Sequence, residues 1–143
     1  MVSFSIVTPS LNQGEYLPEA LQSVACQNYP ALEHLVFDGG STDSSVRMLA
    51  ALSGSPEWRH LRWVSRPDRG QSDALNQGFR HARGDVFGWL NADDRYLPGC
   101  FETVARFFTH HPEVDIVYGD YQWIDQCGTV MQVRREIGFS RFV

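Results

Sequence analysis

The amino-acid sequence predicts an α/β protein with three layers, α/β/α, and a mostly parallel central sheet. Short apolar runs typical of strands alternate with segments whose apolar residues recur at helical spacing. A polar cluster directly follows each of the first predicted strands, at Thr8, Asp38, Asp68 and Asp93. Parallel strands end at the same edge of a sheet, and ligands bind outside their carboxyl ends. We therefore expect these clusters to line one rim and to form a binding site.

The composition is that of one globular domain covering residues 1–143, with a formal charge of -5. Because no basic cluster is present, we expect no nucleic-acid partner. No segment approaches the roughly 20 apolar residues of a transmembrane helix. Cys26, Cys100 and Cys127 are too few and too far apart for a disulfide framework, and Cys26 lies in an apolar helical pattern typical of a core. A cytoplasmic protein is expected, with docking at a membrane surface left open.

The first half of the chain contains two predicted strand–helix pairs. The first strand is followed by a polar loop, Pro9–Gly14, and the first helix ends near Pro30, because proline disfavours helix in the residue before it. The second strand breaks at Asp38-Gly39-Gly40, and Ser/Thr/Asp capping candidates precede the second helix. The predicted elements are a strand at 4–8, a helix at 17–25, a strand at 32–37 and a helix at 46–52.

The second half continues the alternation and ends in a hairpin. Gly70 precedes one helix, Pro98 begins the next, and His110 and His111 mark its end. The hairpin turns at Gln126-Cys127-Gly128. The predicted elements are a strand at 61–65, a helix that follows Gly70 and extends to 82, a strand at 86–90, a helix at 98–110, a strand at 114–119 and hairpin strands within 121–133. Residues 137–143 predict no element.

The acidic cluster after residues 86–90 indicates a metal site. An apolar run ends abruptly in Asn91-Ala92-Asp93-Asp94. Two adjacent carboxylates repel each other unless a cation or a ligand's donors offset the charge. Carboxylate oxygens and few histidines favour Mg²⁺ or Mn²⁺ over zinc. Asp93 is the expected ligand, whereas Asp94 is either a second ligand or a residue that braces the loop.

Other strand-end residues suit a phosphate-bearing ligand. The carboxylate of Asp38 can accept an N–H of a base such as uracil, although it can also simply cap the next helix. Asp73 and Asn76 share one face of a helix near the rim, where Asp73 can instead complement the helix dipole. No glycine-rich phosphate loop follows the first strand. The negative charge of a diphosphate must then be neutralised by the metal, assisted by Arg66 or Arg69.

Four segments in order resemble the family-2 glycosyltransferases with the GT-A nucleotide-sugar fold. Each segment alone is weak evidence, but their order and spacing agree from the first strand to about Asp94. A nucleotidyltransferase is a weaker alternative, because no glycine-rich, lysine-bearing loop follows the first strand. The matching segments are Ser5–Asn12, Asp38–Asp43, Pro67–Gly78 and Gly84–Asp94.

The resemblance implies transfer of a sugar from a UDP- or GDP-type donor to a hydroxyl of a glycan or lipid-linked acceptor. The transfer would invert the anomeric centre, with a metal on Asp93 stabilising the leaving diphosphate. Thr8 and Asp38 would hold the nucleoside, and Asp68 or Asp73 would lie near the base, ribose or sugar. The residues assigned to donor binding are Thr8, Pro9, Asn12, Asp38, Arg66, Asp68, Asp73, Asn76, Asn91 and Ala92.

Two departures from the family pattern limit these expectations. Asn91 replaces the first acid of the Asp-x-Asp motif, so we expect weakened metal binding with Asn91 in a supporting place. In the family, the catalytic base and much of the acceptor site come after the central hairpin, and this chain ends at Val143. Asp120 and Asp125 are the candidates for a base. The alternative is a donor-binding module that is inactive alone, whose uncovered apolar face would favour a homo-oligomer.

Overall fold

The computed structural model describes residues 1–136 and confirms an α/β fold with a parallel sheet. Four strands form this sheet in the order β3-β2-β1-β4, and all of its neighbouring strands pair in parallel. The elements are β1 (Phe4–Ser10), α1 (Leu17–Ala25), β2 (Leu32–Asp38), α2 (Ser45–Leu52), η1 (Pro56–Trp58), β3 (Leu61–Ser65), α3 (Gln71–His81), β4 (Val86–Trp89), α4 (Cys100–His110), β5 (Tyr121–Ile124) and β6 (Val130–Arg134).

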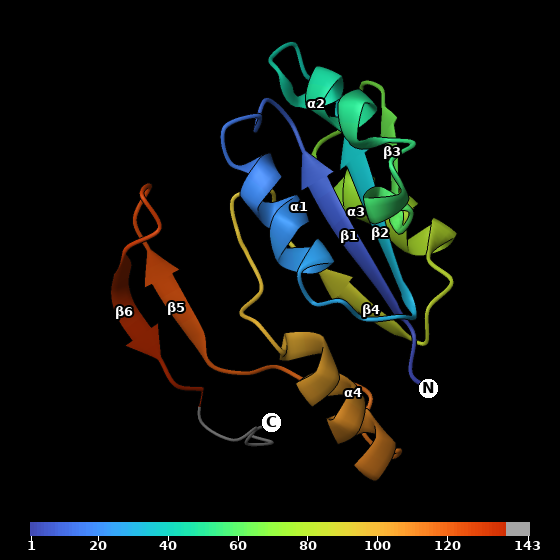
Figure 1. Ribbon diagram of the computed structural model, residues 1–143, viewed down its shortest axis with the longest axis vertical. Helices are drawn as coiled ribbons and strands as arrows, with labels where there is room; N and C mark the ends of the chain where they lie inside the picture. Colours follow the sequence, from blue (N-terminus) through green and yellow to red (C-terminus); the bar gives the residue numbers. More distant parts are fainter. Residues whose placement is uncertain (137–143) are drawn as a thin grey trace. The chain divides into compact units, whose positions relative to one another are not determined.

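The strand order explains why the helices cover both faces of the sheet. The chain moves outward from β1 to β2 and β3, and then returns across the sheet to place β4 on the other side of β1. Right-handed crossovers that run in opposite directions put their helices on opposite faces. Accordingly, α1 and α3 lie on the two faces of the sheet (Figure 1).

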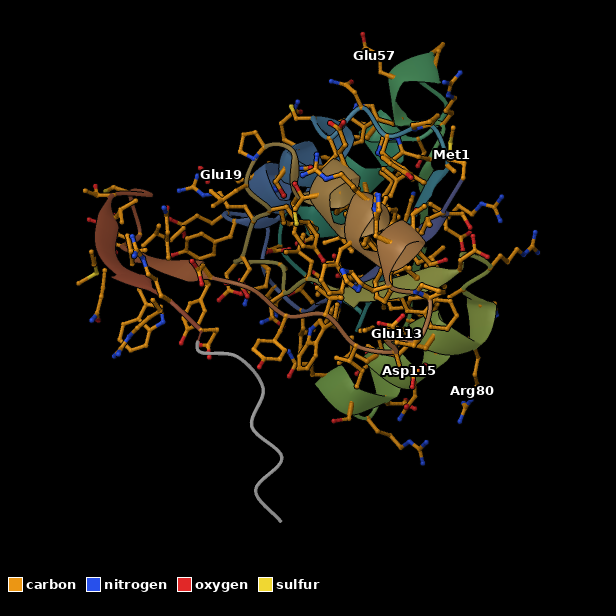
Figure 2. All side chains as sticks on the ribbon, turned by 90° about the horizontal axis from the view of Figure 1, so that it is seen from below. Met1, Glu19, Glu57, Arg80, Glu113 and Asp115 are labelled. Carbon is orange, nitrogen blue, oxygen red and sulfur yellow. The ribbon has the colours of Figure 1, made fainter. Side chains whose placement is uncertain are left out.

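Three apolar clusters hold these layers together. On one face, α1 and α4 pack on β1, while α1 and α2 pack on β2 and β3. On the other face, α3 packs on β1 and β2. Contact between α3 and β1 is unusually close at Gly78, where an added Cβ would lie 2.2 Å from Cγ1 of Val7. Charged side chains such as Glu57 and Arg80 project outward instead (Figure 2).

The first strand continues beyond its predicted end at Thr8 and includes Pro9 and Ser10. Both residues stay in register with β2, whereas pairing with β4 stops at Val7. Proline lacks an N–H and is tolerated where a strand has a free edge. The loss of one neighbour therefore explains why β1 can accept a proline inside a buried strand.

Contacts divide the chain into two compact units, 1–110 and 111–143, so a single domain over the whole chain stays a prediction. In the second unit the predicted hairpin is confirmed as antiparallel β5 and β6. The predicted strand at 114–119 is wrong, because these residues pair with no strand among the described residues and Ile116 is 79% exposed. Cys26 is also exposed rather than buried, since it lies just past the last buried turn of α1. No described helix is long and apolar enough to cross a membrane.

Candidate functional site

The carboxyl ends of the parallel strands bring the polar clusters to one rim. The register places Ser10 beside Asp38 and Asp38 beside Ser65. Asn91 follows the end of β4, which pairs with β1. The strand order reverses between β1 and β4, and such a switch point leaves a crevice outside the strand ends where ligands bind in open α/β sheets. The predicted position of the site therefore matches the topology of the sheet.

Asp38 organises the loop after β2. Its side chain is buried, and Oδ2 accepts hydrogen bonds from the backbone N–H of Gly40 at 3.1 Å and of Ser41 at 2.8 Å. The Ser65 hydroxyl donates to the same oxygen at 2.6 Å, and the Ser41 hydroxyl donates to Oδ1. Asp38 thus ties β2 to β3 and fixes the Gly-Gly turn. Its predicted role as a reader of the base stays a prediction.

Ser10 is a rim residue that the sequence reasoning did not single out. Its backbone carbonyl accepts the N–H of Gly39 at 2.8 Å, whereas its buried side-chain hydroxyl has no hydrogen-bond partner among the described residues. Burying a hydroxyl without a partner costs about 1–3 kcal/mol. A donor or acceptor on a ligand is one way to remove that cost. In the sequence Ser10 lies in the polar loop predicted after the first strand, so no local pattern marked it as buried.

Thr8 lies deeper than a rim position. Its side chain is fully buried, and Oγ1 lies 2.9 Å from Nε2 of His34 on the neighbouring strand. Burial, together with the nearby His60, lowers the pKa of His34 to about 3, so the imidazole is neutral at pH 7. The hydroxyl of Thr8 therefore braces β1 against β2, and its predicted role in holding the nucleoside stays a prediction.

The loops after β1 and β2 are fastened to each other. Asn12, which has a left-handed backbone with φ of 54°, donates its N–H to the Ser41 hydroxyl at 2.7 Å. Its side-chain oxygen accepts the N–H of Thr42 at 2.9 Å, and Asp43 accepts the N–H of Gly14 at 2.8 Å. The backbone N–H and side-chain oxygen of Asn12 thereby hold the two loops together, and its predicted role in donor binding stays a prediction.

The loop after β3 reaches the Gly-Gly turn through Asp68. Oδ1 of Asp68 accepts the N–H of Gly70 at 2.7 Å, and an added Cβ at Gly39 would lie only 3.1 Å from Oδ2. Glycine at position 39 thus lets the Asp68 carboxylate approach the backbone of the neighbouring loop. Arg66, which is exposed, donates to the side-chain oxygen of Gln77 on α3.

Asp73 lies in the first turn of α3 and accepts hydrogen bonds there. The backbone N–H and the guanidinium of Arg69 each donate to its carboxylate at 3.2 Å, and Gln77 donates at 3.2 Å as well. These hydrogen bonds, that from the Arg69 side chain foremost, hold the pKa of Asp73 below its ordinary value. Asn76 lies exposed one turn further along the helix. Asp73 therefore stays charged near neutral pH, and its predicted role in donor binding stays a prediction.

Asn91 is the centre of a hydrogen-bond network at the end of β4. Its Oδ1 accepts the indole N–H of Trp89 at 2.8 Å and the amide of Gln71 at 2.9 Å. Its Nδ2 donates to Oδ2 of Asp94 at 2.9 Å. Both lone pairs of Oδ1 are thus engaged, and Asp94 braces the loop as one of its two predicted roles requires. Trp89 and Gln71 were not among the predicted site residues.

The carboxylates of this loop suit a metal ion that is bound jointly with the phosphates of a ligand, rather than a metal ion held by protein side chains alone. Asp93 is exposed, while the neighbouring Ala92 is buried and anchors the loop in the core. The described residues contain no group of three or more His, Cys, Asp or Glu side chains that could hold a metal. Mg²⁺ is commonly bound by one or two carboxylates together with substrate phosphates. Asp93 can supply one such carboxylate.

The two candidate bases, Asp120 and Asp125, both make structural contacts within the second unit. Asp120 accepts the N–H of Glu136 at 3.0 Å, beside the ends of the hairpin. Asp125 accepts the N–H of Cys127 at 2.8 Å and of Thr129 at 2.9 Å inside the turn. These bonds, that from Thr129 foremost, lower the pKa of Asp125 and make it a weaker base. The catalytic base stays unassigned in this chain.

The fold and the rim together are typical of α/β proteins that bind ligands at the switch point of the sheet, and here carboxylates, not a glycine-rich loop, lie at that point. The chain belongs to glycosyl transferase family 2, whose model matches residues 5–142. A glycosyltransferase of Rickettsia felis is 32% identical over 129 residues, which is 90% of this chain and 21% of that protein. The chain therefore spans about a fifth of the length of this relative.

Solved structures share the fold. S. aureus TarS 1–349 in complex with UDP-GlcNAc superimposes with a TM-score of 0.66 at 23% identity, covering 77% of this chain and 32% of that one. The mannosyltransferase PcManGT from Pyrobaculum calidifontis, in complex with GDP-Man and Mn²⁺, gives a TM-score of 0.65 at 26% identity, covering 83% and 34%. Both matches confirm the GT-A architecture of the sheet and its helices.

Proposed function

We propose that the rim formed by β1 to β4 binds the nucleotide-sugar donor of a glycosyltransferase that moves a sugar onto a hydroxyl acceptor. The observation that carries the proposal is the exposed Asp93 carboxylate outside the end of β4, at the switch point of the sheet. A carboxylate there would bind a metal ion that is also bound to the diphosphate. Membership of the family and the likeness to a mannosyltransferase structure with GDP-Man and Mn²⁺ support this assignment.

The nucleoside would lie over the ends of β2 and β3. Asp68 and Asp73 offer carboxylate oxygens there, and Asn76 offers a side-chain amide. Asp38 fixes the Gly-Gly turn beside them, and Pro67 and Asp68 pack against its two glycines. Ser10 adds a buried hydroxyl without a partner among the described residues.

The diphosphate would lie between this region and Asp93. Mg²⁺ or Mn²⁺ bound with the donor would supply Lewis-acid stabilisation of the leaving diphosphate. Asp93 would hold one side of that complex, and Asn91 would keep the loop rigid through Trp89, Gln71 and Asp94. The guanidinium of Arg66, exposed near α3, would add positive charge for the phosphates.

A donor-binding module that needs further chain to act is the second candidate function. It is favoured by the contacts of Asp120 and Asp125, which engage the two candidate bases in holding the hairpin. It is also favoured because the chain covers only 21% of the length of the Rickettsia felis relative. The acceptor, a glycan or a lipid-linked hydroxyl, would then be bound outside this chain.

One set of measurements tests both candidates. The chain is titrated with UDP, GDP, UDP-GlcNAc and GDP-mannose in a calorimeter, with and without Mn²⁺, and donor hydrolysis and sugar transfer are followed in parallel. Metal-enhanced binding of a nucleoside diphosphate supports the proposal. Binding without turnover favours the module, and the absence of binding by all four compounds overturns both candidates.

A further inference from the structure

Trp89 presents an exposed aromatic ring whose orientation is fixed. The side chain is 53% exposed although it belongs to a strand of the main sheet. Its indole N–H donates to Asn91 at 2.8 Å, and Asn91 is itself held by Gln71 and Asp94. A large exposed aromatic ring costs hydrophobic free energy, and here a polar network keeps it in one place. Such an arrangement suits a surface that meets a ligand.

The position of Trp89 relates it to the proposed donor site. It is the last residue of β4, and the loop that follows carries Asn91 and Asp93. Phe87 lies two residues earlier on the same face of the strand, is 52% exposed, and stacks on Phe79 with ring centroids 6.1 Å apart. Trp89 is therefore the rim end of an aromatic strip along β4.

The chemistry of the ring restricts what it can recognise. Because its only polar hydrogen is bound by Asn91, the indole offers a ligand its faces and apolar edges. The negative face of an aromatic ring attracts weakly positive C–H groups, which a pyranose ring presents on one side. Recognition of a nucleobase by hydrogen bonds needs a free donor or acceptor. This indole has none, because its only N–H is already bound by Asn91.

Strand order separates the sugar from the base. The proposed nucleoside region lies over β2 and β3, whereas Trp89 lies on β4, at the opposite edge with β1 between. Neighbouring strands are about 4.8 Å apart, so β2 and β4 are separated by roughly 10 Å. That interval leaves room for a diphosphate between the base at one end and a sugar near Asp93 at the other.

We propose that Trp89 is a stacking platform for a pyranose ring next to the diphosphate, and that Asn91 is its positioning residue. The proposal rests on the proposed function, because it needs a donor bound at the rim. The pyranose is either the donor's own sugar or that of the acceptor. Both offer the same C–H face to the indole.

The test compares the wild-type chain with Trp89→Leu and with Phe87→Leu as a matched control on the same strand face. Calorimetry with Mn²⁺ gives the Kd of UDP, UDP-GlcNAc, GDP and GDP-mannose for each protein. Trp89→Leu should leave the affinity for UDP or GDP within about twofold and weaken the sugar-bearing donor about tenfold. Phe87→Leu should change neither affinity.

A second titration identifies which sugar stacks. Glucose, mannose and N-acetylglucosamine are added to the protein already saturated with UDP or GDP. Loss of monosaccharide binding in Trp89→Leu, with unchanged donor affinity, assigns the platform to the acceptor. A double-mutant cycle then tests Asn91, because Asn91→Ala should weaken sugar binding in the wild type and have no further effect once Trp89 is replaced.

The outcomes separate the two proposals. If UDP and GDP bind the wild type but Trp89→Leu matches it in every donor and monosaccharide titration, the platform is overturned and the donor site stands. If neither nucleotide nor sugar donor binds the wild type, the proposed function itself fails. Equal loss for Trp89→Leu and Phe87→Leu would also overturn the specific role of Trp89.

Discussion

The hydroxyl of Ser65 donates a 2.6 Å hydrogen bond to the carboxylate of Asp38, joining the ends of β2 and β3 at the rim. Asp38 is 2% exposed and accepts further hydrogen bonds from the turn that follows it. Asp38, which the sequence predicts to hold the nucleoside, is thus also a structural centre of the rim. Its replacement has consequences for stability that can be separated from binding.

Asp38→Ala should lower the free energy of unfolding by about 3 kcal/mol, because two backbone N–H groups and two hydroxyls lose their shared acceptor. Urea denaturation followed by circular dichroism measures the change. Asp68→Ala is the matched control, since Asp68 is half-buried and accepts one backbone N–H, from Gly70. A loss at Asp38 no larger than that at Asp68 would contradict the structural role.

Asp93→Ala should abolish the Mn²⁺-dependent part of nucleotide-sugar affinity, a loss of at least about tenfold. Because Asp93 is exposed, the free energy of unfolding should stay within about 0.5 kcal/mol of the wild type. Calorimetry with and without Mn²⁺ measures the first effect, and a urea titration measures the second. Glu57→Ala, at an exposed acid on η1, is the control. Metal-dependent affinity that survives in Asp93→Ala would remove this residue from the metal site.

Stability should fall as the pH drops from about 6.5 toward 3, with a contribution from His34 of about 1.4 kcal/mol per pH unit. Burial lowers the pKa of His34 from 6.5 to about 3 in the folded state. Between these values the unfolded chain binds a proton that the folded chain does not, so acid favours unfolding. Above pH 6.5 the imidazole is neutral in both states and the effect vanishes.

The pH dependence is measured by thermal unfolding at a series of pH values. His34→Gln removes the titrating group and should flatten the profile, whereas His81→Gln, at an exposed histidine, should not. Equal slopes in wild type and His34→Gln would show that other groups cause the acid sensitivity.

Gly78→Ala should destabilise the fold by more than about 2 kcal/mol, because its Cβ would lie 2.2 Å from Cγ1 and 2.9 Å from Cγ2 of Val7. The double variant Gly78→Ala with Val7→Ala removes both colliding methyl groups and should recover part of the loss relative to Val7→Ala alone. Gly119→Ala is the control, since no atom of the described residues lies within 4 Å of a Cβ added at that position. Urea denaturation gives each value, and additive effects in the double variant would rule out the close contact.

Local sequence signals were sufficient for most elements of the first unit. The strand runs, helical spacing and breakers such as Pro30 and Gly70 all mark boundaries that depend on nearby residues. The predicted strand at 114–119 was wrong because a strand needs a neighbouring strand to hydrogen-bond with. An alternation of apolar residues along the chain does not supply that neighbour. The end of β1 was missed for the converse reason, since pairing with β2 carries the strand through Pro9.

By itself, the sequence determined the α/β class, the rim where the polar clusters meet, and the family. Those features follow from periodicity and from the order of motifs along the chain. Only the tertiary structure decided what each side chain contacts there. Thr8 is buried against His34, and Asp38 accepts hydrogen bonds from the turn that follows it, whereas Asp93 and Trp89 are exposed. The reason is physical, because burial and hydrogen-bond partners come from strands distant in sequence, which no local pattern specifies.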